Sequence, residues 1–549
     1  MRVGEYLFQR LKAEGVTHTF GIPGDYALSL YDAQESCGLP TIVMTHEPSV
    51  GYAADVYARL KGLGVALVTY GVGALNMVNA VAMAYAEQSP VLVITGAPEV
   101  QWQDQNVLFY HRVKSSETQL RVYQEVTAAQ ASIRDPVQAA TEIDRVLATI
   151  KRLSRPGFIE IARDIVNCPI ESPPEQTRVV PLAESEEATA GMREALTEIL
   201  VRLKASKQPV LYAGVEIERF GLMREFKQLV DRTQLPVATS LLGKAVLPEH
   251  HPSFIGTYFG SIGPEAVRKY LEGSDCVLAL GMLMTMMDMG IRTGTLDRRR
   301  LIQVTTQGTS ISYHHYPQAT LAALLNALLQ SPELGKFKSP KLTTAKPPRV
   351  PETKVLTMDG IIAELNAFLS PAHIVLADTG DCLFASVELR ADYFIGPGYY
   401  ASMGLAVPGA IGAQIARPDL RPVVLVGDGA FKMDGIEVAT ARDYGLNPII
   451  VLINNRTYAT LKVSSGDRSY FRLRPWDYVG LAQALGGQGV QVRSREEFHR
   501  ALRLAEASQD FWIIDAVIDE ADTSATLRKL GQELRVMSTA TPVKRSRRT

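Results

Sequence analysis

The stretch that decides the fold is 423–461, which reads VVLVGDGAFKMDGIEVATARDYGLNPIIVLINNRTYATL. One apolar run, 423–426, ends at Gly427-Asp428-Gly429, and a second, 448–453, ends at Asn454-Asn455. Apolar runs bounded by turn residues are typical of buried strands, so the stretch predicts a strand, a helix and a second parallel strand. Polar residues then follow both strands at the carboxyl edge of the sheet, where parallel sheets bind ligands.

The side chains at this edge favour a hard metal ion. Asp428 offers a carboxylate and Asn455 an amide oxygen, both of which suit Mg²⁺ or Ca²⁺. The glycines on either side of Asp428 would let a ligand approach the backbone closely. The alternative is an aspartate in a hairpin and an asparagine pair in a turn of an ordinary α/β layer. The spacing of 27 residues between Asp428 and Asn455, with strand patterns on both sides, favours the ligand site.

Composition excludes several classes of protein. The chain has 549 residues, 46% of them hydrophobic and 21% charged, with a formal net charge of -1. That balance is typical of a soluble globular protein and argues against partners bound by electrostatics, such as nucleic acid or a membrane surface. The four cysteines, Cys37, Cys168, Cys276 and Cys382, lie far apart, which indicates reduced thiols. We see no uncharged apolar run long enough to span a membrane, and expect a cytoplasmic protein.

Strand and helix patterns alternate along most of the chain, so the expected fold class is α/β, with three doubly wound domains. The domains are expected at 1–168, 188–330 and 355–535. Two polar segments, 169–187 and 331–354, are expected to be linkers, and the basic end, 536–549, to be a disordered tail. The first and third domains look like two copies of one sheet topology.

Several motifs together resemble those of the thiamin diphosphate (ThDP)-dependent 2-oxo acid decarboxylase family, and most of all its bacterial indolepyruvate and phenylpyruvate decarboxylases. Besides 423–461, they are IPGDYALSLYD (22–32), THEPSVGYAADVYAR (45–59), VTYGVGALNMVNAVAMAYAEQSPVLVITGAP (68–98), ADTGDCLF (377–384) and GYYASMGLAVPGAIGA (398–413). The resemblance implies pyrimidine-binding, central and diphosphate-binding domains in that order. It also implies ThDP and Mg²⁺ as cofactors, and non-oxidative decarboxylation of a 2-oxo acid to an aldehyde and CO₂ through a ThDP ylid and an enamine.

Glu47 is the most informative residue of the first domain. It follows a strand in Thr45-His46-Glu47-Pro48, where partial burial of a carboxylate would raise its pKa toward neutrality. The resemblance implies that Glu47 hydrogen-bonds the aminopyrimidine ring of the cofactor and so drives formation of the ylid. Taken alone, Glu47 is better explained as an acidic residue that stabilises a helix N-terminus, and the Gly427–Gly429 and Asn454-Asn455 motifs shift the balance toward the cofactor role.

The resemblance also assigns the remaining site residues. Asp25 would handle the proton of the enamine, with His111 and Tyr110 as further catalytic residues, and the backbone carbonyl of Thr457 would join Asp428 and Asn455 as a metal ligand. Met403 would bend the cofactor, although a core methionine is the ordinary reading of such a residue. With Glu47 and the metal ligands, the cofactor-binding residues would be Gly71, Asn79, Thr379, Asp381, Ala401, Met403, Gly427, Gly429 and Ala430.

Two positions depart from the family pattern. Family members have adjacent histidines where this chain has Tyr110-His111, and pyruvate decarboxylases have a catalytic glutamate where it has Leu461. The missing carboxylate fits an aromatic or bulky apolar substrate, such as phenylpyruvate or indolepyruvate. The expected substrate pocket consists of Tyr70, Leu75, Cys382, Thr460 and Leu461.

The missing first histidine leaves two other functions open. One is a ThDP-dependent carboligase that passes the enamine to a second carbonyl and forms an acyloin or acetolactate-like product. The other is a non-catalytic ThDP-binding paralogue, against which the intact Glu47 argues. In the family the active site is shared between subunits, so we expect at least a homodimer, and a homotetramer as the usual assembly.

Overall fold

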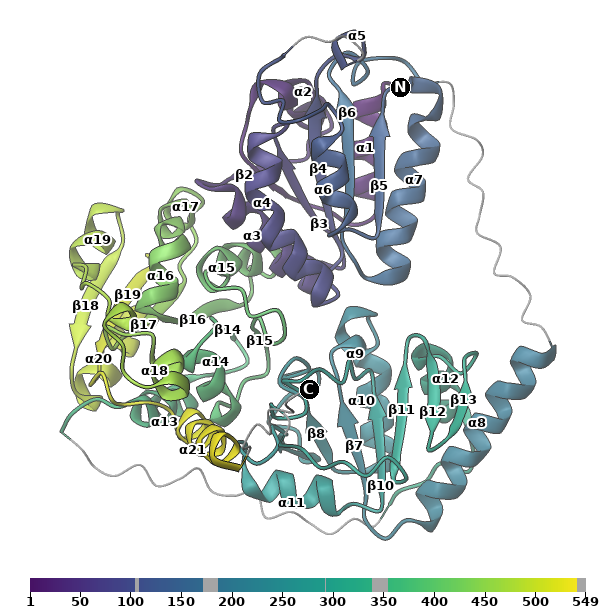
Figure 1. Ribbon diagram of the computed structural model, residues 1–549, viewed down its shortest axis with the longest axis vertical. Helices are drawn as coiled ribbons and strands as arrows, with labels where there is room; N and C mark the ends of the chain where they lie inside the picture. Colours follow the sequence, from purple (N-terminus) through teal and green to yellow (C-terminus); the bar gives the residue numbers. More distant parts are fainter. Residues whose placement is uncertain (104–107, 171–185, 292, 338–353, 541–549) are drawn as a thin grey trace, which may run out of the picture.

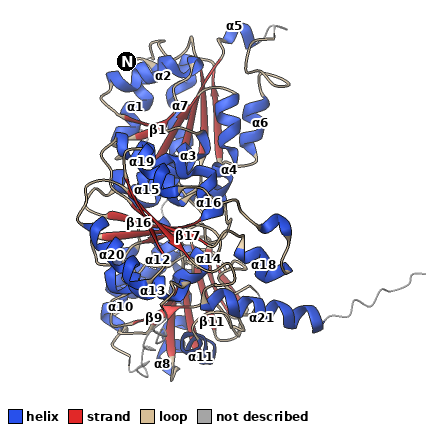
Figure 2. Cartoon of the chain, turned by 90° about the vertical axis from the view of Figure 1, so that its left-hand side faces the viewer, coloured by secondary structure: helices blue, strands red, loops and turns tan. Residues whose placement is uncertain are grey.

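The computed structural model describes residues 1–103, 108–170, 186–291, 293–337 and 354–540. Figure 1 shows three α/β domains: the first at the top, the third at the lower left and the central one at the lower right. Each is built on one sheet, and the strands of all three appear in red in Figure 2. The expected fold class is confirmed.

The first domain has a six-stranded parallel sheet in the order β2-β1-β3-β4-β6-β5. Every residue of its central strands β3 and β4 is buried, because helices cover both faces of the sheet. The elements are α1 (Val3–Ala13), β1 (Thr19–Gly21), η1 (Asp25–Ala27), α2 (Leu28–Ser36), β2 (Thr41–Val43), α3 (Glu47–Lys61), β3 (Gly64–Val68), α4 (Val72–Ala86), β4 (Val91–Ala97), α5 (Val100–Gln103), α6 (Thr118–Gln124), β5 (Ala129–Ile133), α7 (Pro136–Leu153) and β6 (Gly157–Ala162).

The third domain repeats this strand order. Its sheet runs β15-β14-β16-β17-β19-β18, so the expected duplication of one topology is found. The elements are α13 (Met358–Phe368), β14 (His373–Ala377), α14 (Asp381–Ala385), η2 (Ser386–Glu388), β15 (Phe394–Ile395), α15 (Ala406–Ala416), β16 (Arg421–Gly427), α16 (Asp428–Asp434), η3 (Gly435–Glu437), α17 (Val438–Asp443), β17 (Ile449–Asn454), α18 (Ala459–Ser465), η4 (Ser469–Phe471), α19 (Tyr478–Ala484), β18 (Gln488–Val492), α20 (Arg495–Glu506), β19 (Trp512–Val517) and α21 (Ala525–Ala540).

The central domain differs from the other two. Its seven-stranded sheet, β13-β12-β11-β10-β7-β8-β9, becomes antiparallel from β11 to β13, because short hairpins and not helices join these strands. The elements are α8 (Glu186–Ala205), β7 (Pro209–Ala213), α9 (Glu216–Arg219), α10 (Met223–Thr233), β8 (Val237–Thr239), β9 (Phe254–Thr257), α11 (Glu265–Gly273), β10 (Cys276–Leu280), β11 (Leu301–Thr305), β12 (Gly308–Ile311), β13 (His314–Tyr316) and α12 (Leu321–Gln330).

The structure adjusts three of the expected boundaries. Helix α8 begins at Glu186, inside the first expected linker, and 171–185 lies outside the described residues. The start of the second linker packs on the central domain, where Leu334 is buried and the Phe337 N–H donates to Thr233 O; 338–353 is not described. Helix α21 runs to Ala540, so the first five residues of the expected tail are helical, and 541–549 is not described.

The first and third domains meet through α3 and α15, which cross closely because small residues line the contact. A Cβ atom on Gly412 of α15 would lie 2.1 Å from the backbone oxygen of Ala53 in α3. Any larger residue would therefore push the two helices apart. Glu47 is the first residue of α3, and Met403 lies in the segment directly before α15.

Candidate active site

The predicted metal ligands meet at the carboxyl edge of the third sheet. Strands β16 and β17 pair in parallel with Gly427 opposite Ile453, so the residues that follow them are neighbours. The Asp428 carboxylate accepts the Arg456 N–H at 2.9 Å, and Asn455 Oδ1 accepts the Thr457 N–H at 3.2 Å. Asp428 is only 2% exposed, and Asn455 and Thr457 are also buried. The role of the three as metal ligands remains a prediction.

These residues fit Mg²⁺ and a diphosphate. A Cβ atom on Gly427 would meet no atom within 4 Å, so the turn is open on one side and a ligand can approach its backbone. The donors are one carboxylate, one amide oxygen and one backbone carbonyl, all hard oxygens. Among the described residues no group of three or more His, Cys, Asp or Glu side chains is arranged to hold a metal. The site we consider contains only one such side chain.

Gly429 is expected to be glycine so that a ligand can approach the backbone, but the structure gives another reason. A Cβ atom there would lie 2.5 Å from the ring of Tyr458, so the missing side chain makes room for a tyrosine and not for a ligand. Ala430, next to it, is buried in the core between the sheet and α15. Of the residues expected to bind the diphosphate in this turn, Gly427 alone is shown to face open space.

Glu47 and the Gly71 turn meet at the carboxyl edge of the first sheet. Glu47 begins α3, is half-buried, and accepts a hydrogen bond from Asn76 Nδ2 at 2.7 Å. A Cβ atom on Gly73 would lie 3.5 Å from Glu47 Oε1. Gly71 has φ of +69°, and a Cβ atom there would lie 2.5 Å from His111 O. Glycine is therefore required at residue 71 both by its backbone conformation and by the loop that covers it.

Tyr110 and His111 gather around the ring of Tyr26, which follows Asp25 in η1. Tyr110 stacks on Tyr26 with ring centroids 4.9 Å apart, and His111 meets Tyr26 edge-on at 6.0 Å. His111 Nδ1 lies 3.1 Å from Tyr70 O. Because a carbonyl only accepts, Nδ1 carries the hydrogen, and Nε2 is the ring nitrogen left for proton exchange. Tyr70 is buried, and its hydroxyl donates to Ser116 O. Through this bond and the one to His111, Tyr70 holds the loop that carries His111.

The strip 399–404 connects β15 to α15 and carries Ala401 and Met403. Ala401 is exposed and has φ of +61°, a conformation that residues with a Cβ rarely adopt. Thr379 Oγ1 donates to Ser402 O at 2.9 Å, and the buried Asp378 carboxylate accepts the N–H groups of Gly404 and Ala406 at 3.0 and 2.9 Å. The strip is therefore held on both sides of Met403.

Three other predicted residues have contacts that the motifs did not indicate. Asn79 donates to Tyr52 and Ser402 and accepts from Tyr400, so its amide joins the first and third domains. Asp381 accepts from the backbone and side chain of Ser524. Cys382 packs in the core of the third domain. Each of these side chains is used by the protein itself, so their expected cofactor and substrate contacts remain predictions.

The remaining residues of the expected substrate pocket differ in exposure. Leu75 is half-buried on α4. Thr460 lies beside the turn before α14, with its hydroxyl 3.8 Å from where a Cβ atom on Gly380 would be. Leu461 follows on α18 and is 47% exposed. Leu461 thus presents an exposed apolar side chain close to the sheet edge that carries Asp428.

Burial alters the acidity of three carboxyl groups at the edge of the third sheet. It raises the pKa of Asp378, Asp381 and Asp428, each to about 6, from the usual 3.8. Hydrogen bonds from backbone N–H groups oppose this shift at all three residues. A nearby cation would oppose it further, which is what a metal ion beside Asp428 supplies.

Sequence reasoning missed Asp378, Asn76 and Tyr26. Asp378 stands in the ADTGD motif, and its position directly after a buried strand was a usable signal. Asn76 lies in the same glycine- and asparagine-containing run as Gly71 and Asn79. Tyr26 offered no signal beyond its place next to Asp25, because aromatic residues are common in cores.

Comparison with known proteins agrees with this geometry. Three family models match: thiamine pyrophosphate enzyme, N-terminal TPP binding domain (1–117), central domain (196–331) and C-terminal TPP binding domain (378–516). Indole-3-pyruvate decarboxylase of Azospirillum brasilense is 36% identical over 97% of this chain and 98% of its own length. An alpha-keto-acid decarboxylase of Mycobacterium tuberculosis (strain ATCC 25618 / H37Rv) is 31% identical over 94% of each chain. The chain therefore belongs to the thiamin diphosphate-dependent 2-oxo acid decarboxylase family.

Proposed function

We propose that this protein decarboxylates a 2-oxo acid with an aromatic or bulky apolar side chain, releasing the aldehyde and CO₂. The observation that carries the choice of substrate is Leu461, an exposed apolar residue on α18 where pyruvate decarboxylases have a glutamate. The relative from Azospirillum brasilense, named indole-3-pyruvate decarboxylase, supports a large substrate. Phenylpyruvate and indolepyruvate are the two substrates we expect first.

In this proposal Asp428, Asn455 and the Thr457 carbonyl would hold Mg²⁺, and with it the diphosphate of the cofactor. Glu47, oriented by Asn76, would exchange a proton with the aminopyrimidine ring, and the Ala401 carbonyl and the Met403 side chain would hold that ring. When bound, ThDP supplies the nucleophilic carbon and the electron sink that loss of CO₂ requires. Asp25 and the Nε2 atom of His111 then deliver the proton that releases the aldehyde.

The surroundings also favour loss of CO₂. A carboxylate that leaves as CO₂ passes from a charged to a neutral species, so an apolar wall destabilises the reactant more than the product. Leu461 supplies such a wall in place of a carboxylate.

The test is product analysis with ThDP, Mg²⁺ and pyruvate, phenylpyruvate or indolepyruvate, each with and without an aldehyde acceptor. We expect free aromatic aldehyde in both arms and a kcat/KM for phenylpyruvate at least tenfold above that for pyruvate. Consumption of none of the three acids would reject the proposal. Coupled product without free aldehyde would establish the carboligase in its place.

Tyr110 is the observation that favours a carboligase as the second candidate. Its hydroxyl cannot act as an imidazole does near pH 7, and its ring is committed to stacking on Tyr26. If protonation through His111 is too slow, the nucleophilic species survives long enough to meet a second carbonyl. If the protein is instead a non-catalytic ThDP-binding paralogue, Glu47→Gln should not change the turnover of any substrate.

Replacing Leu461 tests its role in selecting the substrate. Leu461→Glu is expected to lower kcat/KM for phenylpyruvate by about tenfold or more, because an aromatic side chain would then bury a carboxylate. The value for pyruvate should change much less, so the ratio of the two constants is the quantity to measure. Leu461→Met, which keeps an apolar side chain of similar volume, is the control. Equal losses for both substrates would place Leu461 outside the pocket.

We infer further that the active site is completed by a second copy of the chain. Helix α5, which precedes the loop of Tyr110 and His111, lies at the end of the first domain away from the third domain (Figure 1). Around Glu47, the Thr45 N–H and the Ser49 hydroxyl bond to Glu437 and Asp434 of the same chain, whereas Asp428 stands at the opposite end of α16. A dimer is the smallest assembly this requires.

A tetramer and a cytoplasmic location remain predictions. None of the helices described here is long and apolar enough to cross a membrane.

Mixing two inactive variants tests this sharing directly. Glu47→Gln and Asp428→Ala chains, co-expressed, should regain activity, because a mixed dimer has one site with both residues intact. Random pairing predicts recovery of about a quarter of the wild-type specific activity. The controls are each variant expressed alone and a single chain that carries both substitutions. No recovery in dimers shown to be mixed would place the complete site within one chain.

A further inference from the structure

Glu87 ends α4 in the first domain, yet its side chain binds the third domain. Its Oε1 atom accepts the N–H groups of Tyr399 at 2.8 Å and Tyr400 at 2.9 Å, 312 and 313 residues further along the chain. Glu87 is 0% exposed. A carboxylate buried at a domain boundary is costly unless it is paired and hydrogen-bonded, so this contact needs a compensating charge.

Arg59 supplies that charge. It lies on α3, pairs with Glu87 at 3.1 Å and with Asp55 at 2.7 Å, and donates to Gly396 O at 3.4 Å. Burial alone would lower the pKa of Arg59, but the charges of Asp55, Glu87 and Glu218 raise it, so the guanidinium stays protonated. The central domain joins through Arg219, whose Nε donates to Glu87 O at 3.2 Å.

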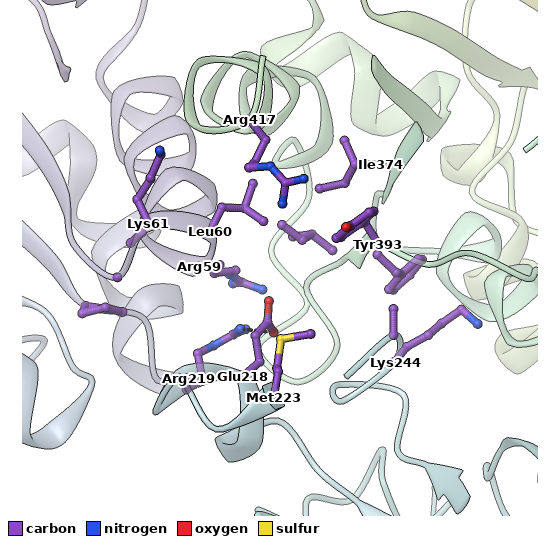
Figure 3. Close-up of a pocket in the computed structure, with 17 residues that line it drawn as sticks. Arg59, Leu60, Lys61, Glu218, Arg219, Met223, Lys244, Ile374, Tyr393 and Arg417 are labelled. Carbon is purple, nitrogen blue, oxygen red and sulfur yellow. Dashed lines mark hydrogen bonds and ion pairs between the residues drawn. The ribbon is translucent and has the colours of Figure 1, made fainter. Parts of the chain in front are cut away.

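The three domains meet at this network. A cavity of about 460 Å³ lies beside it, and Figure 3 shows Arg59, Glu218 and Arg219 converging on one side of that cavity. The arginines and the buried lysine of its wall are each paired with a carboxylate: Arg59 with Asp55 and Glu87, Arg219 with Glu218, Lys244 with Glu249 and Arg417 with Asp419. These four cations are thus committed to the protein, and we assign no ligand to the cavity.

What the network holds is the strip that carries Ala401 and Met403. Glu87 fixes the peptide planes of Tyr399 and Tyr400, directly before the left-handed Ala401. Asp378 and Thr379 fix the strip after Ala401. A residue with a Cβ at positive φ persists only where its neighbours are held firmly, so the conformation of Ala401 depends on both anchors.

We infer that Glu87 is a positioning residue for the cofactor: its carboxylate holds the strip so that the Ala401 carbonyl and the Met403 side chain face the aminopyrimidine. The inference rests on the roles proposed above for Ala401 and Met403. Glu87 itself touches neither substrate nor cofactor. It acts through two backbone amides, which explains why an acidic residue of the first domain stays buried against the third.

The experiment compares Glu87→Gln and Glu87→Asp with Asp55→Asn. All three disturb the same buried ion network around Arg59, but the N–H groups of Tyr399 and Tyr400 donate to Glu87 and not to Asp55. We expect all three to lower the melting temperature. Both Glu87 variants should weaken ThDP binding at saturating Mg²⁺ at least tenfold, measured by calorimetry, whereas Asp55→Asn should change it less than threefold. In the Glu87 variants kcat should fall while KM for the 2-oxo acid stays within twofold.

Amide hydrogen exchange of the Tyr399 and Tyr400 region keeps the inference testable if Glu87→Gln does not fold. Protection there should be high in the wild-type protein and fall in Glu87→Asp, which retains the charge but withdraws the carboxylate by one methylene. Equal losses of ThDP affinity in Asp55→Asn and Glu87→Gln, or unchanged affinity in both Glu87 variants, would overturn the inference. Failure of the wild type to decarboxylate any 2-oxo acid would reject the proposed function but leave these binding results interpretable.

Discussion

Glu47→Gln is expected to lower kcat by about 10²–10⁴-fold on every accepted 2-oxo acid, the range that loss of a positioned proton-transfer group produces. Glutamine keeps the size of the side chain and can still accept the hydrogen bond from Asn76, so the start of α3 should be undisturbed. It cannot, however, exchange a proton with the cofactor. We therefore expect the loss in kcat with little change in the melting temperature, measured by steady-state kinetics and calorimetry.

The matched control is Glu142→Gln. Glu142 lies on α7 of the first domain and pairs with Arg145 at the surface, so this variant removes a carboxylate away from Glu47 and from the residues around Tyr26. Asn76→Leu should give an intermediate loss, since it leaves the Glu47 carboxylate in place but without its partner. If the Glu47→Gln variant keeps more than a third of the wild-type kcat, Glu47 is not a proton-transfer group and only stabilises the N-terminus of α3.

Asp428→Ala is expected to abolish Mg²⁺-dependent binding of ThDP, with affinity reduced at least about a hundredfold and activity lost with it. Asp428 is the one carboxylate among the proposed ligands, and removing a ligand from a site of three protein oxygens leaves too little charge to hold the ion. Calorimetric titration of ThDP with Mg²⁺ and with a chelator measures the effect. Asp434→Asn, at the other end of α16, is the control and should leave Mg²⁺ binding intact.

The pH dependence follows from the acidity of the same group. Burial raises the pKa of Asp428 to about 6 in the metal-free chain, and Mg²⁺ binds only the carboxylate. The affinity for Mg²⁺ should therefore fall as pH drops below about 6, by about tenfold per pH unit. Because the folded chain binds this proton more tightly than the unfolded one, the metal-free protein should lose stability as pH rises from about 4 to about 6, and Mg²⁺ should restore it. An affinity independent of pH between 5 and 7 would contradict Asp428 as a ligand.

The sequence predicted the local parts of the site well for a physical reason. Parallel pairing of β16 with β17 places the residues after both strands at one edge, so Asp428 and Asn455 had to meet once the strands were recognised. Glu47 and the Gly71 turn meet at the edge of the first sheet for the same physical reason, because β2 and β3 both pair in parallel with β1. Repetition of one strand order in the first and third domains was visible because both share the same alternation of strand and helix.

Contacts between distant segments were beyond the sequence. Nothing in the motif around Asn79 indicates that its amide bonds to Tyr400 and Ser402, and nothing in 398–413 indicates that Glu87 accepts from Tyr399. A buried carboxylate and a surface one look alike in a sequence, because only the fold determines which amides surround them. The antiparallel edge of the central sheet was missed because its strands are short and joined by hairpins.

The sequence by itself thus determined the fold class and the polar residues at each sheet edge, since these follow from strand ends, and it indicated the cofactor through the family that its motifs resemble. The tertiary structure alone decided how the strip with Ala401 and Met403 is held: by Asp378 of the same domain and by Glu87 of the first domain. The reason is that hydrogen bonds to backbone N–H groups carry no signature in the residue that donates them. Periodicity reveals which side chains are buried, but only the packed domains reveal which buried charges act on one another.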